Sequence, residues 1–164
     1  MSGREVILGV TGGIAAFKTA GLVSQLVQAG VAVQVVMTAS AEKFVGKATF
    51  AALSGHPVAT ELFEDEHFPL GAHIMLSQRA RLLCVAPATA NFLAKAAHGL
   101  ADDLLTTLYL CFRGPVLVAP AMNCEMWDHP AVQRNVTRLR DDGVRFVDPE
   151  EGWLSCRQKG VGRM

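Results

Sequence analysis

The sequence carries no excess charge of either sign, because its 15 lysine and arginine residues balance 15 aspartate and glutamate residues. Binding to nucleic acid or to an anionic membrane surface depends on a surplus of positive charge. We therefore expect no nucleic acid and no membrane among the partners. With 164 residues, of which 51% are hydrophobic, the chain can bury a substantial core, and we expect a single domain over residues 1–164.

The N-terminus lacks the layout of a secretory signal, since its short apolar segment is broken by Gly12 and Gly13. The apolar stretch at residues 82–100 approaches membrane-spanning length but is interrupted by Pro87, Asn91, Lys95 and His98. A strand followed by a helix fits this stretch better than a membrane span does. These absences predict a cytoplasmic protein.

Cysteine is sparse and is not grouped in C-x-x-C pairs. The four cysteines are Cys84, Cys111, Cys124 and Cys156. Their wide spacing indicates neither a zinc site nor a disulfide framework, so we expect no metal. Cys84 and Cys111 lie in apolar segments and are predicted to belong to the core.

Five short runs of aliphatic and β-branched residues alternate with helical patterns. The runs are apolar throughout, which is typical of parallel strands covered by helices on both faces. The strands are expected at residues 6–10, 31–37, 82–86, 116–119 and 144–147, and helices at about 15–28, 91–97, 102–112 and 130–140. The pattern predicts an open, mostly parallel α/β sheet of the three-layer Rossmann-like or flavodoxin-like kind. Ligands of such sheets bind beyond the carboxyl ends of the strands.

The first expected strand is followed by Thr11, Gly12, Gly13 and Ile14. Glycines at this point let backbone N–H groups approach a phosphate at a helix N-terminus. The segment is not the dinucleotide motif G-x-G-x-x-G. A tight turn without a ligand is an equally good interpretation of the glycine pair alone.

The second expected strand is not followed by an acidic residue, although a dinucleotide fold would place one there for the ribose diol. The chain has Thr38 and Ser40 instead. Their hydroxyls can donate hydrogen bonds to phosphate oxygens, which favours a mononucleotide. A helix N-cap formed by Ser40 is equally compatible with these residues.

The third expected strand leads into small residues, which would let a flat ring approach the backbone. Thr89 and Asn91 could then hydrogen-bond the edge of that ring, and an ordinary capped turn is the alternative. The fourth strand leads into Pro120–Trp127, where Met122, Asn123 and Met126 suggest an apolar pocket with one polar side chain that hydrogen-bonds the ligand. The two methionines could equally fill the core.

The segment Pro120–Trp127 reads P-A-M-N-C-E-M-W and matches P-x-M-N-x-x-M-W at every fixed position. With this motif, residues 10–18, residues 86–95 and the segment Gly71-Ala72-His73-Ile74, the chain resembles the homo-oligomeric flavin-containing cysteine decarboxylases over nearly its whole length. The resemblance implies an enzyme that uses FMN. It also implies trimers, sometimes gathered into larger shells, with the flavin near a subunit boundary.

The same resemblance implies roles for individual residues. His73 would be the acid/base residue, and Asn123 would hold the substrate carboxylate beside Met126. Cys156 falls where members of the family that act in coenzyme A synthesis carry a cysteine that completes the cycle. FMN would lie on Gly12, Gly13, Ile14, Thr38, Ser40, Thr89, Ala90, Asn91 and Phe92.

The implied reaction is decarboxylation of 4'-phosphopantothenoylcysteine to 4'-phosphopantetheine. Oxidation of the cysteine thiol to a thioaldehyde creates an electron sink, loss of CO2 leaves an ene-thiol, and the reduced flavin returns the electrons. An imidazole suits the proton transfers because histidine ordinarily titrates near working pH. The amide of Asn123 would orient the carboxylate without stabilising its charge as an arginine would.

Three other functions are alternatives to this prediction. A peptidyl-cysteine oxidative decarboxylase of the same family would release the ene-thiol and would not need Cys156. A non-catalytic flavin-binding regulatory subunit would lack one of His73, Asn123 and Cys156, all of which are present here. A flavin prenyltransferase of related fold would lack the P-x-M-N-x-x-M-W motif.

Two features near the C-terminus bear on the site. Arg157 follows Cys156 where a glycine is frequent in the family, so we expect the local turn to differ. Residues 152–162 form a glycine-containing tail, which we expect to be mobile and to close over the pocket as a flap.

In many bacterial relatives this domain is fused to a synthetase, so a phosphopantothenoylcysteine synthetase is an expected partner, either separate or fused.

Overall fold

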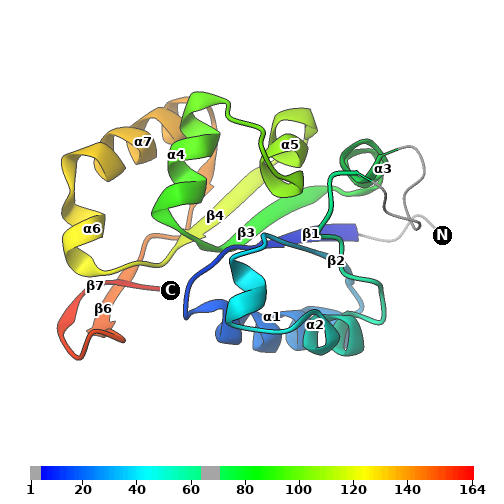
Figure 1. The fold of residues 1–164 in the computed structure, drawn as a ribbon, viewed down its shortest axis with the longest axis horizontal. Helices are drawn as coiled ribbons and strands as arrows, with labels where there is room; N and C mark the ends of the chain where they lie inside the picture. The colour runs from blue at the N-terminus through cyan, green and yellow to red at the C-terminus, as the bar shows by residue number, and fades with distance from the viewer. Residues whose placement is uncertain (1–4, 64–70) are drawn as a thin grey trace.

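The computed structural model describes residues 5–63 and 71–164. Five strands form one sheet in the order β2-β1-β3-β4-β5, and all four pairings are parallel (Figure 1). This flavodoxin-like order confirms the predicted α/β class. The strands are β1 (Glu5–Val10), β2 (Ala32–Met37), β3 (Leu82–Ala88), β4 (Val116–Pro120) and β5 (Arg145–Phe146).

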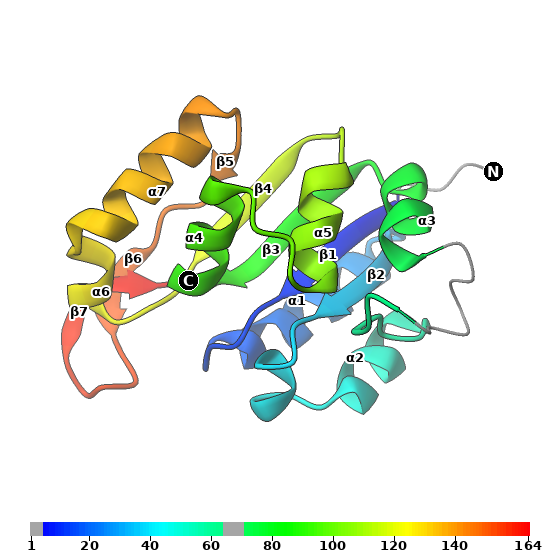
Figure 2. The ribbon, with the colours of Figure 1, turned by 45° about the horizontal axis from the view of Figure 1, so that its top comes forward.

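Helices cover both faces of the sheet, as Figures 1 and 2 show. One face carries α1 (Ala16–Gln28) and α2 (Lys47–Ser54). The other face carries α3 (Ala72–Arg79), α4 (Ala90–His98), α5 (Leu104–Cys111) and α7 (Pro130–Asp141). The short helices η1 (Ala41–Lys43) and α6 (Cys124–Asp128) follow β2 and β4.

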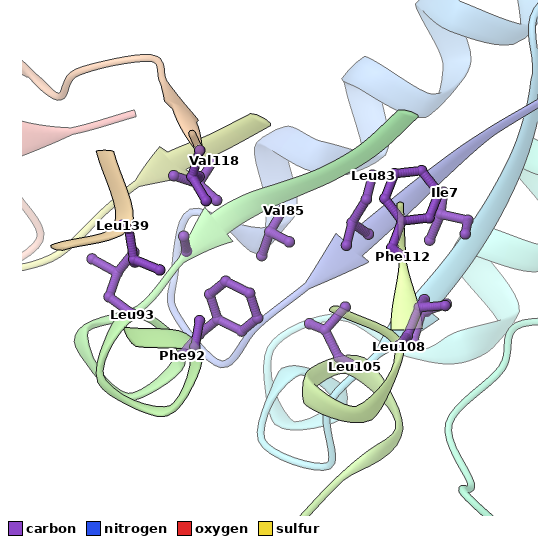
Figure 3. Packing of buried hydrophobic residues seen from close by; sticks show 14 of the residues in the cluster. Ile7, Leu83, Val85, Phe92, Leu93, Leu105, Leu108, Phe112, Val118 and Leu139 are labelled. Atoms are coloured by element: carbon purple, nitrogen blue, oxygen red, sulfur yellow. The ribbon is translucent and has the colours of Figure 1, made fainter. Parts of the chain in front are cut away.

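Two apolar clusters hold these layers together, one on each side of the sheet. In the larger cluster, Leu105 and Leu108 of α5 and Phe92 of α4 pack on the strands (Figure 3). Gly9 of β1 is required there, because a Cβ at this position would lie 2.6 Å from Leu105 Cδ1. The close approach of α5 therefore depends on the missing side chain at residue 9.

Local sequence determines where several helices begin and end. Thr89 Oγ1 accepts a hydrogen bond from the Phe92 N–H at 3.3 Å and caps α4, and Asp103 forms a capping box with Thr106 at the start of α5. Gly99, with φ of 68°, ends α4 in the left-handed conformation. These signals explain why the predicted extents of the longer helices were close to those observed.

The C-terminal segment forms a β-hairpin that the sequence analysis did not predict. Strands β6 (Glu150–Trp153) and β7 (Lys159–Arg163) pair in antiparallel register and stand apart from the main sheet. Helices α2, α3 and α6 were also missed. The placement of Cys111 in the core was wrong, because this residue ends α5 and is exposed, while the next residue, Phe112, turns inward.

In the described ranges, no helix combines the length and the apolarity that crossing a lipid bilayer would require.

Candidate flavin site

A cavity of about 970 Å³ lies beyond the carboxyl ends of strands β1 to β4. We refer to it as the strand-end cavity. Its size lies in the range of pockets that take drug-sized ligands and cofactors. Its walls include residues 11–15, 17–18, 38–40, 89–92, 121–123, 126, 153–156 and 162–164. All nine residues predicted to bind the cofactor line it, as do Asn123, Met126 and Cys156.

The first wall is the loop after β1, which enters α1. Helix α1 begins without a side-chain cap, whereas α4, α5, α6 and α7 each begin with one. Within the described residues, no hydrogen bond uses the amides of Gly12 or Ile14 as donors. Unpaired N–H groups at an uncapped helix start are suited to an anion.

The second wall is the loop after β2, which lies against the first. A Cβ on Gly12 would lie 2.3 Å from Ser40 Cβ, so the close approach of the two loops requires glycine here. Ser40 stands at the N-cap position of η1, yet its side chain makes no capping bond. The predicted N-cap position of Ser40 is therefore confirmed, without the side-chain hydrogen bond that usually accompanies it. Thr38 Oγ1 instead accepts from the Ala41 N–H at 3.3 Å, and its O–H remains a donor toward the cavity.

The third wall is tied to the first by a buried hydroxyl. Thr11 Oγ1 donates to the Pro87 carbonyl at 2.6 Å and accepts from the Thr89 N–H at 3.0 Å. The capped-turn interpretation of this loop was correct, since Thr89 caps α4. The Phe92 ring packs edge-on against Tyr109, with 6.2 Å between ring centroids, so core packing occupies this side chain.

The fourth wall is the P-x-M-N-x-x-M-W segment. Asn123 Oδ1 accepts a hydrogen bond from the Glu125 N–H at 2.8 Å and caps α6. Asn123 therefore has a structural role, and its side-chain NH2 group keeps two donors on the cavity wall. Met122 both lines the cavity and packs against the core, while Met126 is 47% exposed at the rim.

The hairpin is fastened directly to this fourth wall. The Met122 N–H donates to the Gly162 carbonyl at 3.0 Å, and a Cβ on Gly162 would lie 2.2 Å from Met122 O. A Cβ on Gly160 would likewise lie 2.8 Å from Cys124 Cβ. Two glycines on one face of β7 thus allow the strand to lie against the motif, and the hairpin turn brings Cys156 to the cavity.

Arg157 occupies that turn with φ of 64°, the left-handed conformation that glycine adopts freely. An arginine thus forms a glycine-like turn in this chain, and a difference from the turn of relatives that carry glycine here stays a prediction. Two backbone hydrogen bonds of 2.9 Å close the turn, from the Leu154 N–H to the Gln158 carbonyl and from the Arg157 N–H to the Leu154 carbonyl.

Among the residues that the structure describes, Cys156 is the only cysteine that lines the cavity. Cys84 is buried in β3, and burial raises the pKa of its thiol to about 11. That thiol is protonated at neutral pH and is shielded from the cavity. Cys156 is exposed on the hairpin, where a ligand can reach it.

His73 does not line the cavity of its own chain. It lies in the first turn of α3, and Figures 1 and 2 place α3 and the hairpin at opposite ends of the molecule. Its Nδ1 is buried and has no hydrogen-bond partner among the described residues. His98 and His129 lie at helix ends, as predicted for histidines other than His73, and His67 lies outside the described residues.

Sequence reasoning missed three cationic residues of the cavity wall, Lys18, Lys95 and Arg163. Lys95 contacts Asp102 at 2.7 Å and Asp103 at 3.2 Å, and the hydrogen bond to Asp102 is the main reason that the pKa of Lys95 is raised. Lys18 follows Ile14 by one helical turn, a spacing that could have revealed it. Arg163 could not be found in this way, because the hairpin was not predicted.

A family model described as Flavoprotein matches residues 1–164. The chain belongs to this flavoprotein family. It is 49% identical over 164 residues to the coenzyme A biosynthesis bifunctional protein CoaBC of Bacillus subtilis, and 52% identical over 161 residues to the protein of the same name from Mycobacterium tuberculosis. The first match covers all of this chain but only 40% of the Bacillus protein, and the second covers 98% of this chain but only 38% of the Mycobacterium protein. This flavoprotein thus spans about two fifths of their length.

Solved structures give the same picture for the fold of this flavoprotein. A PPC decarboxylase variant complexed with pantothenoylaminoethenethiol is 30% identical with a TM-score of 0.86, covering 99% of this chain and 91% of that chain. The FMN-dependent cysteine decarboxylase SpaF is 39% identical with a TM-score of 0.84, covering 96% of this chain and 89% of that one.

Proposed function

We propose that this flavoprotein binds FMN in the strand-end cavity and decarboxylates 4'-phosphopantothenoylcysteine to 4'-phosphopantetheine, a cytoplasmic step of coenzyme A synthesis. One observation carries the proposal. The cavity brings an amide donor, Asn123, and an accessible thiol, Cys156, to an uncapped helix start flanked by free hydroxyls. The similarity to CoaBC proteins and to a PPC decarboxylase structure supports it independently.

The residues of the cavity fit FMN. A phosphate at the start of α1 would meet the amides of Gly12 and Ile14 and the hydroxyls of Thr38 and Ser40. Gly12 packs directly against Ser40, which brings these amides and hydroxyls together on one side of the cavity. The flavin ring would then lie against the small residues Gly13 and Ala90 and near the side-chain amide of Asn91.

The chain's own residues supply positioning and protons. Because the cap fixes Asn123 Oδ1, the NH2 group of this residue is directed to acceptors such as the substrate carboxylate. Bound FMN supplies the two-electron oxidation of the substrate thiol and the reduction that ends the cycle. Cys156 would donate the proton of that last step, since a thiol is a far stronger acid than an aliphatic hydroxyl.

We propose that His73 acts in the cavity of a neighbouring subunit of a trimer or a multiple of one. Three features of the chain support this proposal. His73 is remote from its own cavity, its Nδ1 is buried without a partner among the described residues, and the adjacent Ile74 is 42% exposed. A second copy would then complete each site.

The closest rival function is peptidyl-cysteine decarboxylation, and the similarity to SpaF, an FMN-dependent cysteine decarboxylase, fits it as well as it fits the proposed reaction. That reaction ends at the ene-thiol and has no use for a proton donor on the hairpin. Cys156 therefore favours the small-molecule substrate. The length of the CoaBC relatives, more than twice the matched region, supports a phosphopantothenoylcysteine synthetase as a fused or separate partner.

Reconstitution tests the proposal. Protein stripped of cofactor should regain a yellow colour and turnover of 4'-phosphopantothenoylcysteine with FMN, and neither with NAD. A Gly12→Ala variant should fold but fail to retain FMN, because its Cβ would meet Ser40. Protein that cannot be loaded with FMN, or that turns over the substrate without it, would contradict the proposal.

A further inference from the structure

Two cationic side chains of the strand-end cavity, Lys18 of α1 and Arg163 of β7, have no role in the chemistry described above. Lys95, the third cation of the wall, is neutralised by Asp102 and Asp103. Within the described residues, neither Lys18 nor Arg163 has a carboxylate within salt-bridge distance. Neither cation on this part of the wall therefore forms an ion pair with a described carboxylate.

Lys18 and Arg163 are held near one another by the junction of α1 with the hairpin. Lys18 Nζ donates to the Met164 carbonyl at 2.5 Å, so the end of β7 lies beside the start of α1 (Figure 1). Burial is the main cause that lowers the pKa of Lys18, and the positive charge of Arg163 adds to it. Glu150, the cross-strand neighbour of Arg163, opposes this shift only in part.

The hairpin also orients the arginine. A Cβ on Gly152 would lie 2.8 Å from Arg163 Cδ and 3.2 Å from its Nη1, so the arginine side chain runs along the glycine backbone of β6. Glycine at residue 152 leaves room for this position of the arginine side chain. Arg163 is exposed and lines the cavity, so a ligand there can reach its side chain.

We propose that Lys18 and Arg163 form an anion subsite that binds the phosphate of the substrate. The inference rests on the proposed function, which gives the substrate two anionic groups. The carboxylate loses its charge in the reaction, so two cations beside it would stabilise the ground state and slow the step. The phosphate keeps its charge throughout, so holding it lowers KM without opposing the chemistry.

The subsite is distinct from the place assigned to the FMN phosphate. That phosphate is expected where Gly12 meets Ser40, on the β2 side of the α1 N-terminus. Lys18 extends instead toward Met164, on the side of the hairpin. Two anions can therefore be held by the two sides of one helix start.

The test compares 4'-phosphopantothenoylcysteine with pantothenoylcysteine, which lacks the phosphate, on FMN-loaded protein. Arg163→Gln should lower kcat/KM for the phosphorylated substrate by about tenfold, because KM rises while kcat stays the same. The kcat/KM for pantothenoylcysteine should not change. Lys18→Gln, on a different element, should produce the same selective loss. Lys159→Gln removes an equal charge from β7 outside the cavity and should behave as wild type with both substrates.

An equal loss with both substrates in Arg163→Gln and Lys18→Gln would overturn the subsite, and so would loss of FMN from these variants at unchanged affinity for the substrate. Failure of the wild-type protein to turn over either substrate would instead overturn the proposed function, and the subsite with it.

Discussion

Asn123 Oδ1 accepts a hydrogen bond from the backbone N–H of Glu125 at 2.8 Å, at the point where β4 passes into α6. One residue thereby caps a helix with its oxygen and presents its nitrogen to the cavity. The two roles can be separated by substitution, because aspartate caps as well as asparagine but has no donor.

Asn123→Asp should keep the stability of the wild-type protein and lose about a hundredfold in kcat/KM, since two donors to a carboxylate are replaced by a second negative charge. Asn123→Ala should lose activity and also about 1 kcal/mol of unfolding free energy. Urea unfolding and steady-state kinetics measure the two quantities. Substantial activity in Asn123→Asp would remove Asn123 from substrate binding.

Gly162 should tolerate no side chain, because its Cβ would meet the Met122 carbonyl oxygen at 2.2 Å and the obstacle is backbone. Gly162→Ala should separate the hairpin from the motif, lower the unfolding free energy by about 1–3 kcal/mol and reduce turnover. Gly21→Ala in α1 is the matched control. A Cβ there meets nothing within 4 Å, and alanine should add up to about 1 kcal/mol. Equal behaviour of the two variants would show that the hairpin is not held in this way.

Arg157→Gly should stabilise the protein by about 0.5 kcal/mol. It relieves the left-handed strain of an L-residue, and the greater freedom of glycine in the unfolded chain offsets part of that gain. Lys159→Gly, within β7, should be destabilising by a similar amount because no strain is relieved. Chemical denaturation of both variants measures the difference. A less stable Arg157→Gly would mean that the arginine side chain makes compensating contacts.

His73→Asn should retain FMN and lose decarboxylation, because proton transfer is not needed to hold the cofactor. If His73 acts across a subunit boundary, mixing refolded His73→Asn and Cys156→Ser subunits should restore roughly a quarter of the wild-type activity, from random pairing of intact halves. Either variant alone supplies the control. No restoration in mixed oligomers would place His73 and Cys156 in one subunit's site and contradict the arrangement.

The sequence predicted the sheet well because short apolar runs rich in aliphatic and β-branched residues, such as residues 82–86, are typical of buried parallel strands. It also identified the cavity loops that follow the strands β1 to β4. The hairpin was missed because its glycines are typical of a mobile tail, whereas the lack of side chains at Gly160 and Gly162 is what allows close contact with the motif. Tertiary contact, which no local pattern reports, determined that segment.

The same limit applies to His73. Its motif pointed to the site, but the position of α3 relative to the cavity depends on tertiary packing and on neighbouring copies of the chain. Lys18 and Arg163 are a third case, since they come together only once the end of β7 is bound by the start of α1.

The central claim, a decarboxylation that Cys156 completes by protonation, is tested most directly by the mass of the product from a single turnover of 4'-phosphopantothenoylcysteine. Wild-type protein loaded with FMN should yield 4'-phosphopantetheine, lighter than the substrate by one CO2. Cys156→Ser should yield the ene-thiol, two hydrogens lighter again, because serine is too weak an acid to supply the last proton. Fully reduced thiol from the serine variant at the wild-type rate, or ene-thiol from the wild-type protein, would contradict the account.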